Sequence, residues 1–462
     1  MNEQPLDPGL RAVFALVPGV APVAMVDRAL AEASTIPQRR PRFPGLDPRA
    51  WPPRPRTVSD PAVRRSARLM FVTAVTLLLI AGVVAVGARL LETRPPRATI
   101  EIAGSLAFEL LGPQALALPD GRILAYGQGT ESIFDPATGE SANVSLGPFV
   151  GPAALALPDG RVLLLGSVDR APSSTRATVV GILDPATGAV TIVGELPVYT
   201  FDPGLAVLAD GRLLVSGGLD PSAPVVGYFD MVWAFDPATG TATSLAPLRQ
   251  PRMNHSMVVL DDGRVLIAGG AGPEAGASGG DVLEVETYDP ETGESSVVGT
   301  INPGRGLAAG PAVRLGDGRV LVPGGFIPDP PCGASRNYRQ ATFIYDPIAD
   351  ELVPGPELPH AVGSAVALLD SRAVVFGNRS VMTGGCDSGT EPFLEPWLGV
   401  VDPTDGTVYE STDTRTGAGT LALELDSAYE IGVLLPDGRV ALITGGPDDP
   451  IPNRVDILTI GD

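Results

Sequence analysis

Residues 257–270 read MVVLDDGRVLIAGG, and the same arrangement returns along most of this 462-residue chain. An apolar run leads into Asp-Gly-Arg, a second apolar run follows, and one or two glycines end it. Asp-Gly between two β-prone runs is a strong hairpin signal, and we expect a type I′ turn with positive φ at both residues. The seven copies are ALALPDGRILAYG (115–127), ALALPDGRVLLLG (154–166), LAVLADGRLLVSGG (205–218), MVVLDDGRVLIAGG (257–270), AVRLGDGRVLVPGG (312–325), AVALLDSRAVVFG (365–377) and IGVLLPDGRVALITGG (431–446).

A second repeated element follows each of the first six copies at a variable distance. Its Asp is expected to hydrogen-bond the turn backbone, Pro presets φ, and Gly adopts a left-handed conformation where it occurs. Apolar residues flank the turn, which predicts a second hairpin and therefore a third and a fourth strand. The copies are IFDPATGE (133–140), ILDPATGA (182–189), AFDPATGT (234–241), TYDPETGE (287–294), IYDPIADE (344–351) and VVDPTDGT (400–407).

Four strands per unit, repeated about every 50 residues, predict an all-β, seven-bladed β-propeller of four-stranded blades. The last unit ends with RVDILTI (454–460) and has no fourth strand of its own. Residues 98–103 align with the fourth strand of another unit, so we expect them to pair with the last blade and close the ring. Closure removes exposed sheet edges. The propeller is thus predicted to span residues 98–462.

The stretch from Pro251 to Glu294 resembles a kelch repeat, because Gly269 and Gly270 end strand two and Tyr288 follows on strand three. The DGRV and YDP-x-TG turns resemble more specifically the kelch-like propeller of the galactose oxidase group. The resemblance covers about residues 98–462 and implies the fold, while propellers as a class host many functions. The glycine pair is broken in three copies, and the tryptophan usual in kelch strand four is absent; Trp397 is expected in a loop.

The same resemblance raises the alternative of an enzyme with its site at the channel mouth, such as an oxidase or a lyase. Copper sites of the galactose oxidase type need two histidines, two tyrosines and a cysteine crosslinked to tyrosine. This chain has only His255 and His360, both expected near the starts of strands. The ligand set is incomplete, so no catalytic residue, metal site or cofactor is predicted.

The charge distribution argues against nucleic acid as a partner. The formal net charge is −21, and the basic residues are all arginine. Arginine predominates before residue 98, whereas the propeller region is strongly acidic and would not neutralise phosphates. The repeated turn aspartates are accounted for by their hairpins, and calcium requires several ligands that converge on one point.

Residues 69–88 read LMFVTAVTLLLIAGVVAVGA, twenty residues without a charge, which predicts one transmembrane helix. Arginines 64, 65 and 68 precede it, so the positive-inside bias places the N-terminus in the cytoplasm and the propeller outside the cytoplasm. A cleaved signal peptide is the rival interpretation, but such peptides begin near the N-terminus and have shorter apolar cores.

Residues 1–68 are then a short cytoplasmic segment, with a helical pattern over 22–34 and a Pro/Arg-rich tether over 37–56. This front end also resembles that of some bacterial membrane-anchored anti-sigma-type proteins. A transmembrane sensor that signals through residues 1–68 is therefore an alternative function.

The connections between strands two and three are expected to be long, uneven loops on one face, and such loops often bind partners. They span roughly 167–178, 219–230, 271–284, 326–340, 378–397 and 447–453. Cys332 and Cys386 occupy equivalent loops of adjacent blades, so we expect a disulfide between them. The candidate binding residues are Arg252, His255, Tyr228, Arg336, Tyr338, Arg339 and Trp397.

These features favour a membrane-anchored extracytoplasmic propeller that binds a protein or a glycan, without catalysis. The propeller is expected to be monomeric.

Overall fold

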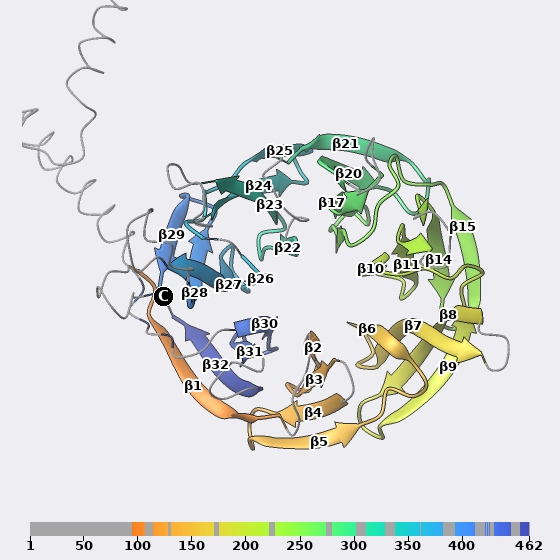
Figure 1. Cartoon of the computed structure of the whole chain (residues 1–462), viewed down its shortest axis with the longest axis horizontal. Coiled ribbons are helices and arrows are strands. Elements are labelled where there is room, and N and C mark those ends of the chain that lie inside the picture. The colour runs from red at the N-terminus through yellow and green to blue at the C-terminus, as the bar shows by residue number, and fades with distance from the viewer. Residues whose placement is uncertain are drawn as a thin grey trace, which may run out of the picture. The chain divides into compact units, whose positions relative to one another are not determined.

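Seven antiparallel four-stranded sheets stand around a central axis in the computed structural model of the chain (Figure 1). This confirms the prediction of a seven-bladed, all-β propeller. The structure describes residues 95–106, 114–127, 131–170, 175–220, 227–273, 280–301, 311–328, 338–360, 362–381, 393–411, 421, 423, 425, 429–444 and 453–461. The predicted transmembrane helix at 69–88 and the segment 1–68 lie outside these ranges. Among the residues that are described, no helix is long and apolar enough to cross a membrane.

Each of the first six blades contains four strands that are consecutive in the sequence, apart from short ribbons, with the first strand nearest the axis. Blades 1 to 3 consist of β2 (Gln114–Ala117), β3 (Ile123–Tyr126), β4 (Glu131–Asp135) and β5 (Glu140–Val144); β6 (Val150–Ala156), β7 (Val162–Arg170), β8 (Thr175–Asp184) and β9 (Ala189–Glu195); and β10 (Gly204–Val207), β11 (Leu213–Ser216), β14 (Val232–Asp236) and β15 (Thr241–Leu245).

Blades 4 to 6 repeat this order. They consist of β16 (Ser256–Val259), β17 (Val265–Ala268), β20 (Glu284–Tyr288) and β21 (Ser295–Thr300); β22 (Val313–Arg314), β23 (Val320–Pro328), β24 (Tyr338–Asp346) and β25 (Glu351–Pro354); and β26 (Ser364–Ala367), β27 (Ala373–Val381), β28 (Phe393–Asp402) and β29 (Thr407–Glu410).

Blade 7 is assembled from both ends of the propeller. Its inner strands are β30 (Tyr429–Leu434), β31 (Val440–Thr444) and β32 (Arg454–Ile460), and its outer strand is β1 (Ala98–Ser105). The register of β1 against β32 runs antiparallel from Ala98↔Ile460 to Ser105↔Arg454. The first strand of the propeller therefore supplies the strand that the last repeat lacks.

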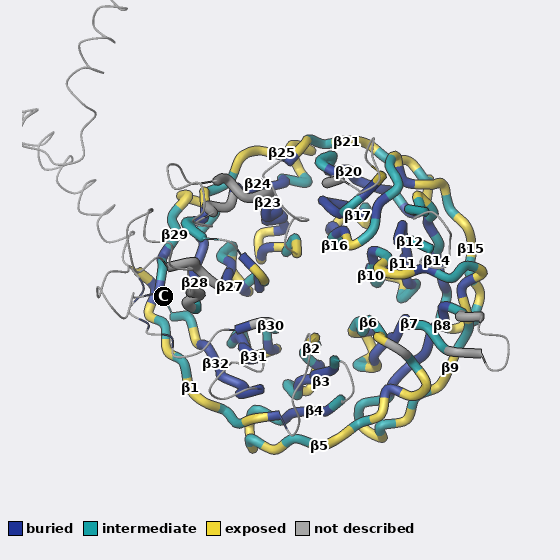
Figure 2. Tube along the Cα trace, in the orientation of Figure 1, coloured by how far each residue is buried: buried dark blue, intermediate teal, exposed yellow. Residues whose placement is uncertain are grey.

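The core lies in the seams between neighbouring blades. Seven hydrophobic clusters are formed, and each joins the middle strands of one blade to those of the next. Strand two is buried along its whole length, as in β11 and β17, because it packs on both faces. The outermost strands alternate between exposed and half-buried residues, and Figure 2 shows this gradient from the middle strands to the rim. Apolar runs at strand two therefore mark a strand that is covered on both sides.

Candidate binding face

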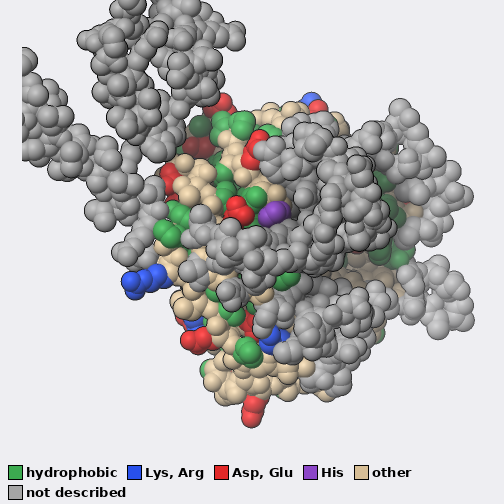
Figure 3. All heavy atoms as spheres, turned by 60° about the vertical axis from the view of Figure 1, so that its left-hand side comes forward, with side chains coloured by type: hydrophobic (Ala, Val, Ile, Leu, Met, Phe, Trp, Pro, Cys, Tyr) green, Lys and Arg blue, Asp and Glu red, His purple; other side chains and the backbone are tan. Residues whose placement is uncertain are grey.

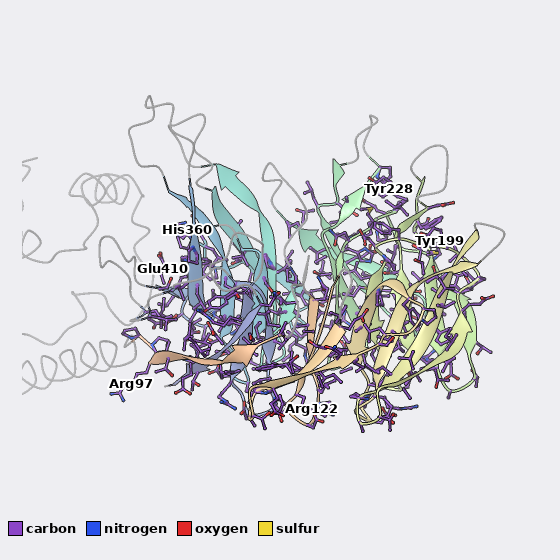
Figure 4. All side chains as sticks on the ribbon, turned by 60° about the horizontal axis from the view of Figure 1, so that its bottom comes forward. Arg97, Arg122, Tyr199, Tyr228, His360 and Glu410 are labelled. Atoms are coloured by element: carbon purple, nitrogen blue, oxygen red, sulfur yellow. The ribbon has the colours of Figure 1, made fainter. Side chains whose placement is uncertain are left out.

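The two ends of the propeller differ in chemistry. We call the end that carries the Asp-x-Arg and Asp-Pro turns the turn face, and the end that carries the strand two-to-three connections the hairpin face. Figure 4 shows Arg122, in an Asp-Gly-Arg turn, at one end and Tyr228, in a strand two-to-three connection, at the other. Only the hairpin face varies between blades.

The Asp-x-Arg turns differ from the predicted type I′ turn. In the first of them the amide of Gly121 donates to the carbonyl of Leu118, and the amide of Leu118 donates to the carbonyl of Arg122. Gly121 has positive φ, whereas Asp120 is not among the described residues with positive φ. These bonds define a three-residue loop that ends in a left-handed glycine. The expectation of positive φ at both residues was wrong, because this loop needs only one.

Each turn aspartate forms an ion pair with the arginine two residues later. The arginine Nε donates to the carboxylate over 2.6–2.9 Å in all seven copies, including Asp370 and Arg372 of the degraded one. The Arg161 side chain and backbone donate hydrogen bonds that hold the pKa of Asp159 below its usual value. The turn carboxylates are thus committed to their own hairpins.

Several of these arginines also reach the next blade. The Arg122 guanidinium donates to the carbonyl of Pro185 over 3.2 Å, and that of Arg264 donates to Asp350 over 2.9 Å. Pro185 and Asp350 both lie in Asp-Pro turns of the following blade. The arginine of the repeated motif therefore links adjacent blades, a role that sequence reasoning missed.

The described hollows on the turn face are lined mainly by residues of the turns and strand ends, and the Asp-x-Arg carboxylates among them are each held by the arginine of the same turn. One of about 480 Å³ lies at the turn-face ends of the inner strands of blades 2 to 4, and its lining includes the ion pair of Asp261 and Arg314. The remaining lining is aliphatic or backbone, from Ala156 to Leu260. Across the described ranges, no group of three or more His, Cys, Asp or Glu side chains could hold a metal ion.

On the hairpin face, the strands continue into segments that were expected to be loops. In blades 2, 5 and 6 the second and third strands extend past the body of the blade, as β23 and β24 do from Val320 to Asp346. In blades 3 and 4 a short ribbon stands there instead. These ribbons pair β12 (Leu219–Asp220) with β13 (Gly227–Tyr228) and β18 (Ala271–Gly272) with β19 (Gly280–Asp281). The connections are therefore ordered hairpins at their bases.

The glycine pairs make room for the segment that leads into each inner strand. We call residues 199–203 of blade 3 and 251–255 of blade 4 the lead-in segments. A Cβ atom on Gly218 would lie 2.0 Å from Thr200 Oγ1, and one on Gly270 would lie 2.6 Å from the carbonyl oxygen of Met253. Both glycines have positive φ, at 90° and 97°. The pair thus allows the lead-in segment to pack closely against the end of strand two.

Arg252 is buried rather than presented to a partner, contrary to the prediction. Its side chain and that of Glu286, on β20, are both 0% exposed, and Nη2 donates to Oε1 over 2.8 Å. Nη1 also donates to the carbonyls of Gly269 and Glu284. Burial lowers the pKa of Arg252, although a guanidinium remains charged at any ordinary pH. The residue joins the lead-in segment to the blade and lies beneath the surface.

His255 is also buried, at 8% exposed, so it too was wrongly expected on the binding surface. Its Nε2 lies 2.8 Å from Ser216 Oγ, and Nδ1 is buried without a hydrogen-bond partner among the described residues. Burial, and secondarily the charge of Arg252, lowers the pKa of His255 to about 3. The imidazole is therefore neutral and links blades 3 and 4.

The same positions are filled differently in other blades. Phe149 leads into blade 2 as Arg252 leads into blade 4, and Gly181 occupies the strand-three position of Glu286. A Cβ atom on Gly181 would lie 2.7 Å from the Phe149 ring. A large apolar residue over a glycine thus replaces an arginine over a glutamate. Side chains at these two positions are matched within each of the two blades.

Trp397 lies on strand β28 and is 1% exposed, so the expectation that it lies in a loop was wrong. It belongs to the core cluster between blades 5 and 6. His360 lies just before β26, and its ring contacts the Trp397 ring edge-on, with the two ring centroids 5.3 Å apart. His360 Nε2 is also 4.0 Å from the Glu410 carboxylate. Figure 3 turns the left-hand side of Figure 1 toward the viewer. Among the described residues visible there, the hydrophobic side chains are separated from one another by polar side chains and backbone.

The remaining predicted residues are placed only in part. Tyr228 is half-buried at the end of β13, on the hairpin face. Tyr338 and Arg339 lie on β24, where they pair with Pro328 and Ile327 of β23. Arg336, Cys332 and Cys386 fall outside the described residues, so the predicted disulfide stays a prediction.

Sequence reasoning missed Phe201, which is 50% exposed in the lead-in segment of blade 3. It pairs with Leu219 of β12, and Leu219 pairs with Tyr228 of β13. Residues directly opposite on antiparallel strands project to the same face. Phe201, Leu219 and Tyr228 therefore form a line of apolar side chains, which we call the aromatic row. The sequence could have indicated Phe201 only by its position in the repeat, where it corresponds to Met253 of the next repeat.

Comparison with known proteins supports the fold. No model of a known protein family matches the chain. Its sequence is similar to Kelch-like protein 36 of Mus musculus and of Rattus norvegicus, each 26% identical over 183 residues, which is 40% of this chain and 28% of the relative. The chain thus spans less than a third of the curated relatives that it matches. This similarity, together with the seven blades, supports a kelch-type propeller.

Among solved structures, the chain is similar to a streptogramin B lyase structure, with a TM-score of 0.51. Sequence identity is 13%, and the likeness covers 79% of this chain and 98% of that chain. At such identity the likeness shows the propeller fold alone.

Proposed function

We propose that this chain is a membrane-anchored, extracytoplasmic kelch-like propeller that binds a protein or glycan partner through its hairpin face, without catalysing a reaction. The partial similarity to Kelch-like protein 36 supports an interaction module. The uncharged stretch 69–88 and the arginines before it support the anchor and its orientation.

The contrast between the two faces carries this proposal. On the turn face, all seven turns between strands one and two repeat the same ion-paired Asp-x-Arg unit, whereas the hairpin face differs from blade to blade in strand length, ribbon and side chains. Variable segments held on a rigid repeated scaffold are where binding usually resides. The aromatic row is one such variable segment among the described residues of the hairpin face.

Site-specific photo-crosslinking tests the binding face. A photoreactive amino acid replaces Tyr228 on the hairpin face or, as the matched control, Ile348, which is 95% exposed in a turn of the turn face. We expect adducts with a partner from Tyr228 and none from Ile348 in cells that express the chain. Equal adducts, or adducts from Ile348 alone, would overturn the proposal.

Protease added to intact cells tests the location. We expect the propeller to be digested while residues 1–88, the cytoplasmic segment with the proposed anchor, survive as a membrane-bound fragment. Full protection of the propeller would contradict the extracytoplasmic placement.

A further inference from the structure

The aromatic row is held in place before any partner arrives. The amide of Phe201 donates to the carbonyl of Leu219 over 2.9 Å, and the reverse bond measures 3.0 Å. The amide of Phe229 donates to the carbonyl of Gly218, which fixes β13 beside β12. Because these bonds fix the backbone that carries the row, a partner does not have to order that backbone on binding, so an exposed aromatic ring in this position favours affinity.

The backbone beside the row is fixed by a contact between two lead-in segments. Asp202 has φ of 47°, in the left-handed region, which Asp and Asn tolerate better than other side chains. Its carbonyl accepts a hydrogen bond of 2.9 Å from the amide of Asn254, which itself has φ of 50°. The same conformation recurs at the equivalent position of blade 4, so it belongs to the frame that the two blades share. Phe201, the most exposed described aromatic side chain, is thus carried on a backbone that the repeat holds in place.

The surroundings of the row are acidic. Asp202 and Asp230 are exposed next to its two ends, and the only cationic residue from 199 to 230 is Arg212, on the turn face. In the connection to blade 4, Arg252 is buried and paired with Glu286, whereas Arg249 is exposed and follows Leu248, whose amide donates to the carbonyl of Asp230. The Phe201 end of the row, beside Asp202, therefore presents negative charge, to which cationic groups are attracted.

We propose that the aromatic row binds a polypeptide segment that presents an apolar or aromatic side chain beside an arginine or lysine. This inference rests on the proposed function and names its partner class. Neighbouring strands lie about 4.8 Å apart, so the row is about 10 Å wide, which suits one or two side chains. Leu219 at its centre offers neither a flat ring nor a hydrogen bond to a sugar, which favours a polypeptide over a glycan.

Panning a library of short random peptides against the immobilised full chain, purified in detergent, tests this inference. The strongest enriched peptide is then synthesised and its affinity measured for the wild type and for variants of matched positions. Phe201→Ala removes the ring of the row, and Met253→Ala changes the equivalent position of blade 4. We expect enriched peptides that combine an apolar side chain with Arg or Lys. Their affinity should fall about tenfold or more in Phe201→Ala and less than about twofold in Met253→Ala.

Asp202→Asn and Tyr228→Ala extend the test, and unfolding midpoints identify any variant that has lost its fold. Absence of enrichment, peptides without cationic residues, or equal affinity of wild type and Phe201→Ala would overturn the inference. Loss of binding to a glycan array in Phe201→Ala, without any peptide binding, would assign the row to glycans instead. Partner adducts on the hairpin face that persist in Phe201→Ala, together with unchanged peptide affinity in Phe201→Ala and Tyr228→Ala, would refute the row while the proposed function stands.

Discussion

Blades 3 and 4 share one backbone arrangement on the hairpin face and carry different side chains on it. Each has a glycine pair, a ribbon, and a lead-in segment with a left-handed residue, Asp202 or Asn254. Two hydrogen bonds between Phe201 and Leu219 are repeated between Met253 and Ala271. The shared parts are backbone contacts, so they hold the frame whatever the side chains are.

The differences lie at equivalent places on that frame. Thr200 in blade 3, with a hydrogen bond to the carbonyl of Gly217, corresponds to Arg252 in blade 4, which pairs with Glu286. Phe201 of the aromatic row corresponds to Met253. The comparison teaches that the repeat fixes the backbone of the hairpin face. Single residues decide how strongly each lead-in segment is held to its blade and which side chain is exposed there.

The largest expected effect comes from breaking the buried ion pair of blade 4. Arg252→Met leaves the Glu286 carboxylate buried without its guanidinium, which should cost about 3–5 kcal/mol of unfolding free energy. Thr200→Val, the matched change in blade 3, removes one hydrogen bond and should cost about 1 kcal/mol. Chemical denaturation measures both. Equal costs would show that the ion pair does not distinguish the two blades.

The second prediction tests the part that the blades share. Gly218→Ala and Gly263→Ala both place alanine at positive φ, near 90°, but only the first meets atoms at short distance, and nothing lies within 4 Å of a Cβ at Gly263. Gly263→Ala should cost about 1 kcal/mol for its conformation alone. Gly218→Ala should cost a further 1–3 kcal/mol, roughly, because Thr200 and Phe201 must move.

Denaturation midpoints of the two glycine variants provide the measurement. If they unfold alike, the glycine pair is required only for its backbone conformation and does not make room for the lead-in segment.

The third prediction concerns His255, whose place in blade 3 is taken by Pro203. Its pKa is lowered from 6.5 to about 3 in the fold, so between these values the unfolded chain binds a proton that the folded chain does not. Stability should therefore fall as the pH decreases through this window, by about 2 kcal/mol between pH 7 and pH 5. His255→Gln should lose this part of the pH dependence. A wild-type unfolding free energy that is flat from pH 7 to pH 5 would contradict it.

The blades and their order could be predicted from the sequence because the signals are local. Gly139 has positive φ and its amide bonds the carbonyl of Asp135, as the Asp-Pro-x-x-Gly pattern requires. The alternation of turns and apolar runs is set within a few residues, and it repeats. The strand two-to-three connections were predicted less accurately, because the length of the strands there depends on pairing that no short sequence motif indicates.

The candidate site was harder to predict because burial is decided between blades. Arg252 and His255 are polar residues just before a strand, and Trp397 was expected in a loop, which suggested a surface. Arg252 is covered because Glu286 stands on the strand opposite, and Trp397 is covered because its ring lies in the seam between blades 5 and 6. Phe201 is the converse: an apolar residue that the register of three short strands leaves exposed. None of these contacts is visible in a window of one repeat.

The pairing of β1 with β32 also has a consequence for how the chain reaches its final state. During synthesis, β1 leaves the ribosome before the other strands of the propeller, and its partner β32 is made last. β1 therefore stays without its partner strand until all the other blades have been synthesised. Contacts between such distant parts of a sequence form slowly, because a long loop must close before they contribute. Ala98–Ser105 is thus an unpaired edge during biosynthesis. Its outward Ile102 remains 66% exposed afterwards, which makes this strand the point at which incomplete chains would associate.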